Sequence, residues 1–230
     1  MKRRDFLSNT TALFGATMFS GAAPMIASAQ TTPVTGGTLI WGHSETTQNL
    51  DMHQTGTAST GRVLQNVHNS IVTVDKDFNV IPMLAESFDT SDDGLVYTFK
   101  LRAGVKFHNG AEMTSEDVKY SFERCANPDT GAVNFEVFNA VESIETPDPL
   151  TVVVTLNAVN APFLSRLAEN GAGVIMPKGS GDVQGETPIG AGPFKFVRRE
   201  FGNEVELDRF DDYWDGPAYL DTVSASVIPE

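Results

Sequence analysis

The sequence predicts an α+β fold whose strands are mainly antiparallel. Three pairs of strand-like apolar segments are each joined by a short turn, and helical patterns fall before and between these pairs. A doubly wound parallel sheet would instead alternate each strand with a helix. The composition agrees with a globular protein, because 40% of the 230 residues are hydrophobic and 20% are charged.

The first expected elements are one strand and one helix. Residues 38–41 form a short apolar run between glycines, which is typical of a strand. A helix is expected from Thr60, with Ser59 or Thr60 as its N-cap. Apolar residues then recur at helical spacing as far as Ile71.

Three hairpins follow along the chain. In the first, residues 91–94 have the composition of a turn, and apolar Tyr97 and Phe99 alternate with polar Thr98 and Lys100 on the strand after it. This alternation predicts an antiparallel strand with one buried face. The second hairpin is expected from strands 141–145 and 151–156, and the third from strands 194–200 and 205–210.

Two further helices are predicted between the hairpins. Thr114 and Asp117 form a variant of the capping box, in which the residue three positions after the N-cap is acidic. The helix that they start places Phe122 and Cys125 on one face with Val118. Asn160 is expected to cap a short helix that continues to Leu167.

Residues 1–29 have the features of an export signal. A positive start is followed by a weakly apolar stretch that is too short for a membrane span. Arg3 and Arg4 indicate a twin-arginine signal, with a Sec signal as the alternative. Ala27 and Ala29 match the small residues that signal peptidase accepts, so we expect cleavage before Gln30 and a periplasmic location.

Charge and cysteine content exclude several classes of function. The first 29 residues carry three basic side chains and one acidic one, so their removal changes the formal charge from −14 to about −16. Such an acidic protein is repelled by nucleic acids and by anionic lipid, so a nucleic-acid partner is not expected. Cys125 is the only cysteine, which excludes an intramolecular disulfide and a thiolate metal cluster.

The segment 97–110, YTFKLRAGVKFHNG, and its continuation to Phe122 closely resemble the signature strand, loop and helix of a bacterial family. These are the extracytoplasmic solute-binding proteins that serve dipeptide, oligopeptide and nickel ABC importers. Gly104 and Gly110 in the signature are expected to give the loop its backbone freedom. Supporting segments in the same order are 36–39, 84–87, 188–194 and 213–216.

The resemblance implies a periplasmic-binding-protein-like clamp of type II, cluster C. It implies that residues 30–62 and 186–230 form an incomplete first-lobe core, and that residues 63–185 form a subdomain inserted into it. Family members are substantially longer, so the second lobe and the returning C-terminal segment are expected to be absent from this sequence. We therefore expect the chain by itself to be functionally incomplete.

The function implied by the resemblance is peptide binding for uptake, without catalysis and without a cofactor. The partners would be a peptide or another small ligand and the permease subunits of an ABC transporter in the inner membrane. Loop 56–61 would lie at the ligand cleft, where free N–H groups at a helix start could meet a ligand carboxylate. The candidate ligand-binding residues are Thr57, Ser59, Thr60, Asn134, Phe135, Asn170 and Gly171.

Other ligands and one other class of function stay open. Members of the same family would include binders of a nickel complex, an opine or a sugar. The four histidines, His43, His53, His68 and His108, lack metal-ligand spacing and are interpreted as core or solvated residues, so no metal site is predicted. A secreted hydrolase is the alternative class, but the sequence lacks the usual nucleophile, zinc and phosphate-loop motifs.

Overall fold

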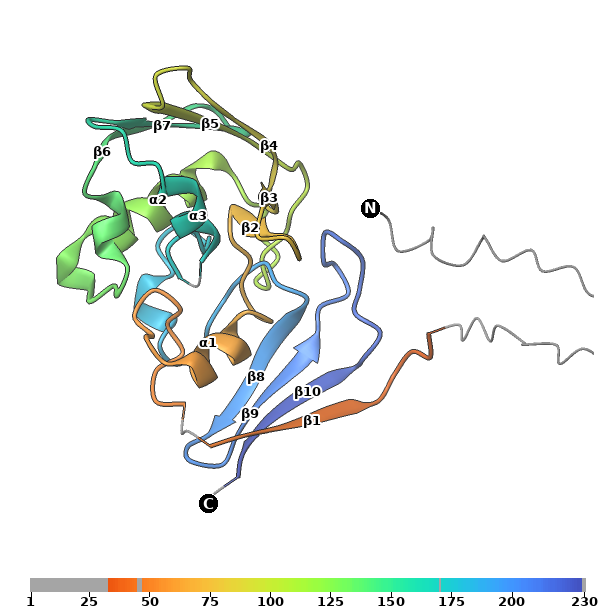
Figure 1. The fold of residues 1–230 in the computed structure, drawn as a ribbon. Coiled ribbons are helices and arrows are strands. Elements are labelled where there is room, and N and C mark those ends of the chain that lie inside the picture. The colour runs from red at the N-terminus through yellow and green to blue at the C-terminus, as the bar shows by residue number, and fades with distance from the viewer. Residues whose placement is uncertain (1–32, 45–46, 170, 229–230) are drawn as a thin grey trace, which may run out of the picture. The chain divides into compact units, whose positions relative to one another are not determined.

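Two four-stranded sheets and a two-stranded hairpin organise the chain (Figure 1). The structure is a computed structural model that describes residues 33–44, 47–169 and 171–228. Within the described residues, all strand pairs but one are antiparallel. The α+β prediction with mainly antiparallel strands is therefore confirmed.

The lower sheet in Figure 1 has the strand order β1-β10-β9-β8. The parallel pair is β1 with β10, which brings Thr38 beside Thr222. This pairing joins segments that are far apart in the sequence, and the strand β10 was not predicted. The bounds are β1 Thr38–His43, β8 Phe194–Glu200, β9 Glu204–Arg209 and β10 Thr222–Val227.

The upper sheet has the order β4-β5-β7-β6 and contains the first and second predicted hairpins. The second turn is tighter than predicted, because the strand before it continues to Asp148. A small hairpin of β2 and β3 precedes this sheet. The bounds are β2 Val72–Val74, β3 Val80–Pro82, β4 Ala85–Thr90, β5 Val96–Leu101, β6 Val141–Asp148 and β7 Thr151–Leu156.

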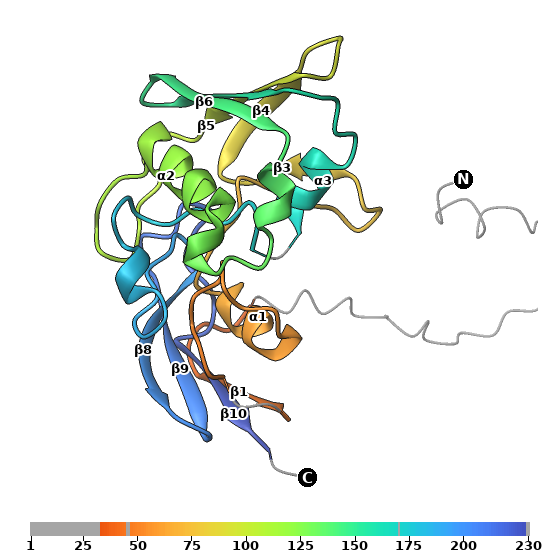
Figure 2. The same ribbon diagram turned by 90° about the vertical axis from the view of Figure 1, so that its left-hand side faces the viewer.

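Three α-helices and three 3₁₀ turns are described between the strands. Figure 2 shows α1 beside the lower sheet, and α2 and α3 below the upper sheet. The predicted capping box starts α2: both the backbone N–H and the hydroxyl of Thr114 donate to the Asp117 carboxylate, at 2.8 and 2.9 Å. The bounds are α1 Ala58–Leu64, α2 Ser115–Ala126, α3 Phe163–Ala168, η1 Pro128–Thr130, η2 Phe135–Phe138 and η3 Gly181–Val183.

Each four-stranded sheet has its own apolar core. Phe99 of the upper sheet packs with Phe122 and Phe163 from the helices below it. Leu64 of α1 and Leu207 of β9 belong to the core of the lower sheet. The chain crosses between the two cores at 67–71, 172–175 and 191–194, where neighbouring residues belong to different cores. We call these crossings the seam.

Backbone segments approach each other closely at the seam. A Cβ on Gly192 would lie 2.5 Å from the carbonyl oxygen of Asn66, and one on Gly190 would lie 2.2 Å from that of Val67. The N–H of Gly192 donates to the Val67 oxygen at 2.9 Å. The glycines of segment 188–194 therefore allow a backbone contact that a side chain would prevent.

The same contacts end α1 earlier than its apolar spacing predicts. The helix was expected to reach Ile71, but it ends at Leu64. The carbonyl groups of Asn66 and Val67 accept hydrogen bonds from the 192–194 segment, and the N–H of Ile71 donates to Gly173 at 2.8 Å. These backbone groups are paired across the seam, so they cannot form helical hydrogen bonds.

The predicted starts of α1 and α3 also need correction. Thr57, rather than Ser59 or Thr60, is the N-cap of α1. Pro162 is the N-cap of α3, while the backbone oxygen of Asn160 accepts from Phe163 N at 3.0 Å. Near the signature loop the prediction is confirmed: Gly104 and Gly110 have φ values of +73° and +84°, a region that disfavours residues with side chains.

Candidate functional site

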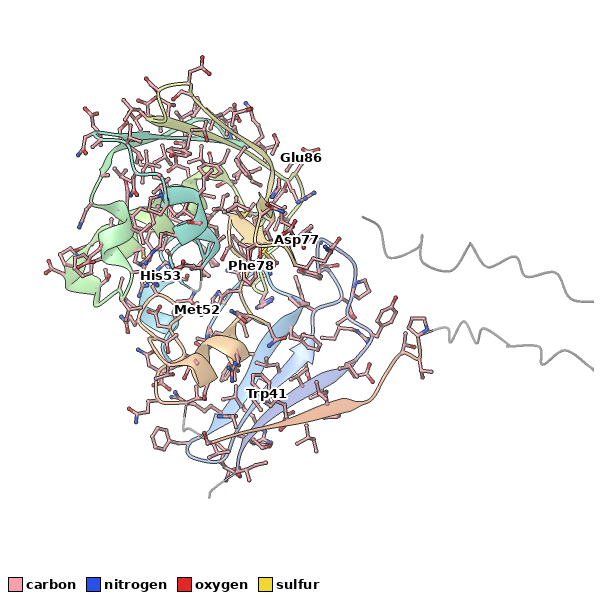
Figure 3. The ribbon with its side chains drawn as sticks, in the orientation of Figure 1. Trp41, Met52, His53, Asp77, Phe78 and Glu86 are labelled. Carbon is pink, nitrogen blue, oxygen red and sulfur yellow. The ribbon has the colours of Figure 1, made fainter. Side chains whose placement is uncertain are left out.

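The loop before α1 lies against the segment that leads into η2. The backbone oxygen of His53 accepts from Val133 N at 2.9 Å, and Gln54 Nε2 donates to the Thr130 oxygen at 2.7 Å. A Cβ on Gly56 would also lie 3.9 Å from the Val133 side chain. Figure 3 labels Met52 and His53 on the stretch that enters this loop. The residues just before two of the predicted cleft segments, 56–61 and 134–135, are thus in contact with each other.

Gly171 brings in the third segment. Its φ of +98° lies in the left-handed region. A Cβ at this position would be 2.9 Å from Asn134 Nδ2 and 3.0 Å from the backbone oxygen of Met52. Only a residue without a side chain fits here without a shift of its neighbours. Residues 54–60, 133–135 and 171 are therefore neighbours in the fold, although Gly171 itself is buried. We call this region the candidate cleft surface.

The predicted residues differ in their access to this surface. Thr57 is exposed, and its hydroxyl donates to Thr60 Oγ1 at 2.9 Å. Ser59 and Thr60 are buried in α1, so their side chains present little surface to a ligand. Asn134 and Phe135 are half-buried, and Asn170 lies outside the described residues. Ligand binding by these residues stays a prediction.

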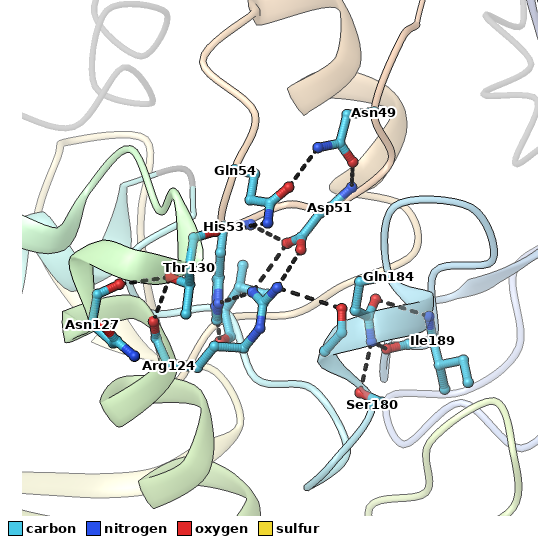
Figure 4. Close-up of polar contacts among 12 residues, drawn as sticks. Asn49, Asp51, His53, Gln54, Arg124, Asn127, Thr130, Ser180, Gln184 and Ile189 are labelled. Carbon is cyan, nitrogen blue, oxygen red and sulfur yellow. Dashed lines mark hydrogen bonds and ion pairs between the residues drawn. The ribbon is translucent and has the colours of Figure 1, made fainter.

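A buried ion pair holds the stretch before the loop (Figure 4). Arg124 of α2 approaches both carboxylate oxygens of Asp51: Nη2 lies 2.5 Å from Oδ2, and Nη1 lies 3.2 Å from Oδ1. The side chains are only 9% and 2% exposed. Asp51 Oδ1 also accepts from the N–H of His53 at 3.0 Å. The carboxylate thus fixes both α2 and the start of the candidate cleft surface.

The position of His53 defines its protonation. Its Nδ1 lies 3.0 Å from Arg124 Nη1, which is a donor, so Nδ1 accepts. Its Nε2 lies 3.1 Å from the Val174 oxygen, so Nε2 carries the proton. Burial lowers the pKa of His53 to about 4, despite the nearby Asp51 carboxylate. His53 is therefore a neutral link between the ion pair and the seam.

Side-chain amides extend this network toward the loop. Asn49 Oδ1 accepts from Asp51 N at 2.9 Å, and Asn49 Nδ2 donates to Gln54 Oε1 at 2.7 Å. Sequence reasoning missed the network, because the histidines were assessed only for metal-ligand spacing. The available signal was an acidic residue between two apolar ones, Leu50 and Met52, both of which are buried.

Two other histidines lie at the seam. His108 Nε2 lies 3.0 Å from the Gly192 oxygen and its Nδ1 accepts from Gly190 N at 3.3 Å, while burial lowers its pKa to about 4. His68 is 3% exposed, and neither ring nitrogen has a hydrogen-bond partner among the described residues. Burial lowers its pKa to about 3. The interpretation of His53 and His68 as core residues is confirmed.

A polar hollow of about 510 Å³ borders the candidate cleft surface. Its described lining residues carry amides or hydroxyls, or have no side chain: Gln48, Asn49, Gln54, Thr55, Gly56, Thr57 and Thr60. Such groups can donate and accept hydrogen bonds without adding charge. The hollow suits an uncharged polar group such as a peptide unit.

Comparison with known proteins identifies the family. Residues 79–230 match the family described as "Bacterial extracellular solute-binding proteins, family 5 Middle". This is more than half of the sequence. The chain belongs to this family.

Relatives in the family are named as binding proteins. The glutathione-binding protein GsiB of Pectobacterium atrosepticum is 34% identical over 179 residues, which is 76% of this chain and 35% of that protein. The oligopeptide-binding protein AppA of Bacillus subtilis is 32% identical over 211 residues, which is 86% of this chain and 38% of that protein. The chain thus spans well under half the length of these relatives.

Solved structures confirm the predicted fold class. The periplasmic binding protein AgaA from A. tumefaciens R10, in complex with agropinic acid, aligns with a TM-score of 0.77 at 35% identity, over 84% of this chain and 40% of that one. The described fold is thus that of one part of a periplasmic binding protein, as the signature segment 97–122 predicted.

Proposed function

We propose that this family 5 protein is the substrate-binding component of an ABC importer and that it binds peptides. The polar hollow beside Thr57 carries the proposal, because each peptide unit presents one N–H and one C=O to such amides and hydroxyls. Relatives named for glutathione and oligopeptides support the same ligand class. The permease subunits of the importer would be the protein partner.

The geometry favours binding over catalysis. His53 is buried, and both of its nitrogens are engaged with Arg124 and Val174, so it is unavailable as a general base. The Asp51 carboxylate is likewise occupied by Arg124. These groups position a surface instead of presenting a reactive atom, which argues against the hydrolase alternative.

Calorimetry of a full-length family 5 protein that contains this segment, with a library of short peptides, tests the proposal, with mass spectrometry of the peptides afterwards. We expect binding, and we expect each peptide to be recovered intact. Thr57→Val should weaken binding by about fivefold, because one hydrogen bond contributes about 1 kcal/mol. Thr90→Val, which changes an exposed threonine on β4, is the matched control. Cleaved peptide would favour the hydrolase reading instead.

An opine is the second candidate ligand. The structure of AgaA contains agropinic acid, and that protein is 35% identical to this chain. The same calorimetric titration with agropinic acid decides between the two classes. Binding of the opine with no binding of any peptide would contradict the peptide proposal while leaving the transport role intact. Nickel complexes and sugars can be added as further titrants.

We also propose export through residues 1–29, which lie outside the described residues. Arg3 and Arg4 support a twin-arginine route, and Ala27 and Ala29 support cleavage before Gln30. Mass spectrometry of the periplasmic protein should find an N-terminus at or next to Gln30. Replacement of both arginines by lysine should retain the protein in the cytoplasm. Normal export of that variant would exclude the twin-arginine route.

The division into a first-lobe core, residues 30–62 and 186–230, and an inserted subdomain, residues 63–185, is part of the proposal. The distribution of the two apolar cores supports it, because most of the upper-sheet core comes from residues 71–175. Limited proteolysis tests it: a resistant fragment that contains residues 71–175 should survive, and early cleavage within that range would contradict the division.

A further inference from the structure

A second hollow, of about 780 Å³, lies between the end of α1, the β2–β3 hairpin and α3. Met52 lines it, and the backbone oxygen of Met52 is the atom that a Cβ on Gly171 would meet at 3.0 Å. The hollow therefore adjoins the candidate cleft surface. Ligand pockets in proteins commonly have volumes of about 300 to 1,000 Å³, so a side chain with its adjoining backbone would fit.

The lining of this hollow combines apolar and polar residues. Met52 and Met83 contribute flexible thioether chains and Val74, Ala168 and Val174 are also apolar, whereas the uncharged polar residues are Gln65, His68, Asn69, Ser70, Thr73 and Ser165. Methionine side chains adapt to ligands of different shape and make favourable contacts with aromatic rings. Among the described lining residues, Glu169 is the one that carries a charge. The hollow therefore suits an apolar group and disfavours an anion.

Phe78 stands at the tip of the β2–β3 hairpin and also lines the hollow (Figure 3). Its side chain is 85% exposed, and its φ of +62° is unusual for an aromatic residue. The Asp75 carboxylate holds the turn by accepting from the N–H groups of Asp77 and Asn79, at 2.8 and 2.9 Å. An exposed ring at the rim, on a turn held by hydrogen bonds, can stack on a ligand.

The buried end of the hollow has an unused polar group. His68 lines it, is 3% exposed, and has no hydrogen-bond partner for either ring nitrogen among the described residues. A buried polar group without a partner costs stability, so such groups usually meet a water molecule or a ligand. A ligand group or a water molecule in the hollow would supply the partner that His68 lacks among the described residues.

We propose that this hollow is a side-chain pocket that accepts an aromatic or thioether side chain of the ligand and rejects an acidic one. The identification of that side chain as part of a peptide rests on the proposed function. The affinity arises from apolar surface that leaves water against Val74, Met83 and Phe78. A carboxylate would lose hydration against these apolar side chains and would meet the negative charge of Glu169.

NMR of the protein with ¹³C-labelled methionine methyl groups tests the pocket without any peptide. The probes are N-acetyl-phenylalaninamide, N-acetyl-methioninamide and the amide of N-acetyl-glutamate. We expect the Met83 methyl signal, assigned with Met83→Leu, to shift on titration with the first two probes. The acidic probe should bind at least about tenfold more weakly, which corresponds to 1.4 kcal/mol.

Filling the hollow provides the decisive variants. Ala168→Trp and Ser165→Trp both place an indole in the lining and should abolish the shift. Ala161→Trp, at an exposed position before α3, should leave it unchanged. Circular dichroism verifies that each variant is folded, and two filling variants keep the test valid if one of them does not fold.

The outcomes separate this proposal from the proposed function. If the Met83 signal does not respond, responds equally to the acidic probe, or still responds in both filled variants, the pocket is refuted. If the probes bind as expected but no peptide binds the protein, the pocket stands and the peptide function fails. If peptides bind with an affinity that neither their side chains nor the filled variants change, the function stands and the pocket fails.

Discussion

Two ion pairs of this protein use the same chemistry in opposite surroundings. The pair of Arg124 and Asp51 lies beside the seam with side chains only 9% and 2% exposed. Arg198 of β8 instead contacts Glu204 and Glu206 across the lower sheet, and its side chain is 49% exposed. Both arginines face more than one acceptor, but only the first is withdrawn from water.

This difference determines what each pair contributes. A buried charge has lost its hydration, so it depends on its partner, and the loss of that partner is costly. An exposed pair exchanges protein contacts for water at little cost and is screened by salt. The buried pair therefore holds the candidate cleft surface in one arrangement. The contacts of Arg198 with Glu204 and Glu206, which we call the exposed ladder, lie instead on a solvent-exposed part of the lower sheet.

The largest effect expected of a single substitution is the loss of one partner of the buried pair. Arg124→Met leaves the Asp51 carboxylate buried without its cation and should lower the free energy of unfolding by about 3 to 5 kcal/mol. Urea denaturation measures this change. Alkylation of Cys125, the neighbouring buried residue whose pKa burial raises to about 12, reports local opening of α2. We expect Cys125 to react faster in the variant.

A double variant distinguishes an unpaired charge from lost packing. In Asp51→Leu/Arg124→Met both charges are absent, so we expect most of the lost stability to return. Arg198→Met, which makes the same change on the exposed ladder, is the matched control and should have little effect. If the double variant is as unstable as Arg124→Met, packing rather than the charge is responsible.

The second expected effect is acid sensitivity of the seam. Burial lowers the pKa of His53 and His108 to about 4 and that of His68 to about 3, from an ordinary value of 6.5. The folded state keeps these rings neutral, while the unfolded chain takes up protons below pH 6.5. Their contribution to stability is therefore complete above pH 6.5 and is lost as the pH falls toward 4.

For each histidine, the free energy of unfolding should fall by up to about 1.4 kcal/mol for each pH unit by which the pH is lowered in this window. Urea denaturation between pH 7 and pH 4.5 measures the total. His108→Gln retains a donor for the Gly192 oxygen and an acceptor for Gly190 N, but glutamine cannot titrate. The free energy of unfolding of this variant should therefore depend less steeply on pH. An unchanged slope in this variant would show that His108 does not take part.

The third prediction concerns backbone contact at the seam. Gly192→Ala places a methyl group 2.5 Å from the Asn66 oxygen, and a backbone atom cannot move away as a flexible side chain would. Overpacking of this kind costs about 1 to 3 kcal/mol. Gly104→Ala tests the other role of glycine, which is to adopt a positive φ. A Cβ at Gly104 would meet no atom within 4 Å, but the residue has a φ of +73°. Denaturation curves with equal midpoints for Gly192→Ala and the parent protein would contradict the close approach.

Local signals in the sequence were sufficient for the elements that depend on neighbouring residues. The turn at residues 91–94 and the capping box at Thr114 both appear as predicted, because their hydrogen bonds join residues within a few positions of each other. The family resemblance of segment 97–122 then supplied the fold class. These predictions needed no knowledge of the tertiary structure.

The features that the sequence did not reveal depend on distant contacts. The pairing of Thr38 with Thr222 joins strands that no short motif connects. The early end of α1 follows from carbonyls at Asn66 and Val67 that pair with residues 192–194. Arg124 and Asp51 are likewise far apart in sequence. For the site, the family resemblance predicted loop 56–61 and residues 134, 135, 170 and 171, and their role in ligand binding stays a prediction. It did not predict the network of Asp51, His53 and Arg124 beside them.

The smallest expected effect is the loss of the exposed ladder. Arg198 contacts Glu204, Glu206 at 2.8 Å and Glu200 at 3.9 Å, and the contacts with Glu204 and Glu206 raise its pKa. Each contact is solvated, so Arg198→Gln should change Tm by no more than about 2 °C in low salt. The difference should disappear in about 0.5 M NaCl, because salt screens exposed charges but not the buried Asp51 carboxylate. Differential scanning calorimetry at both salt concentrations, with Arg124→Met measured alongside, makes the comparison direct. If the decrease in Tm for Arg198→Gln persists in high salt and approaches that of Arg124→Met, solvent exposure does not determine what the two ion pairs contribute to stability.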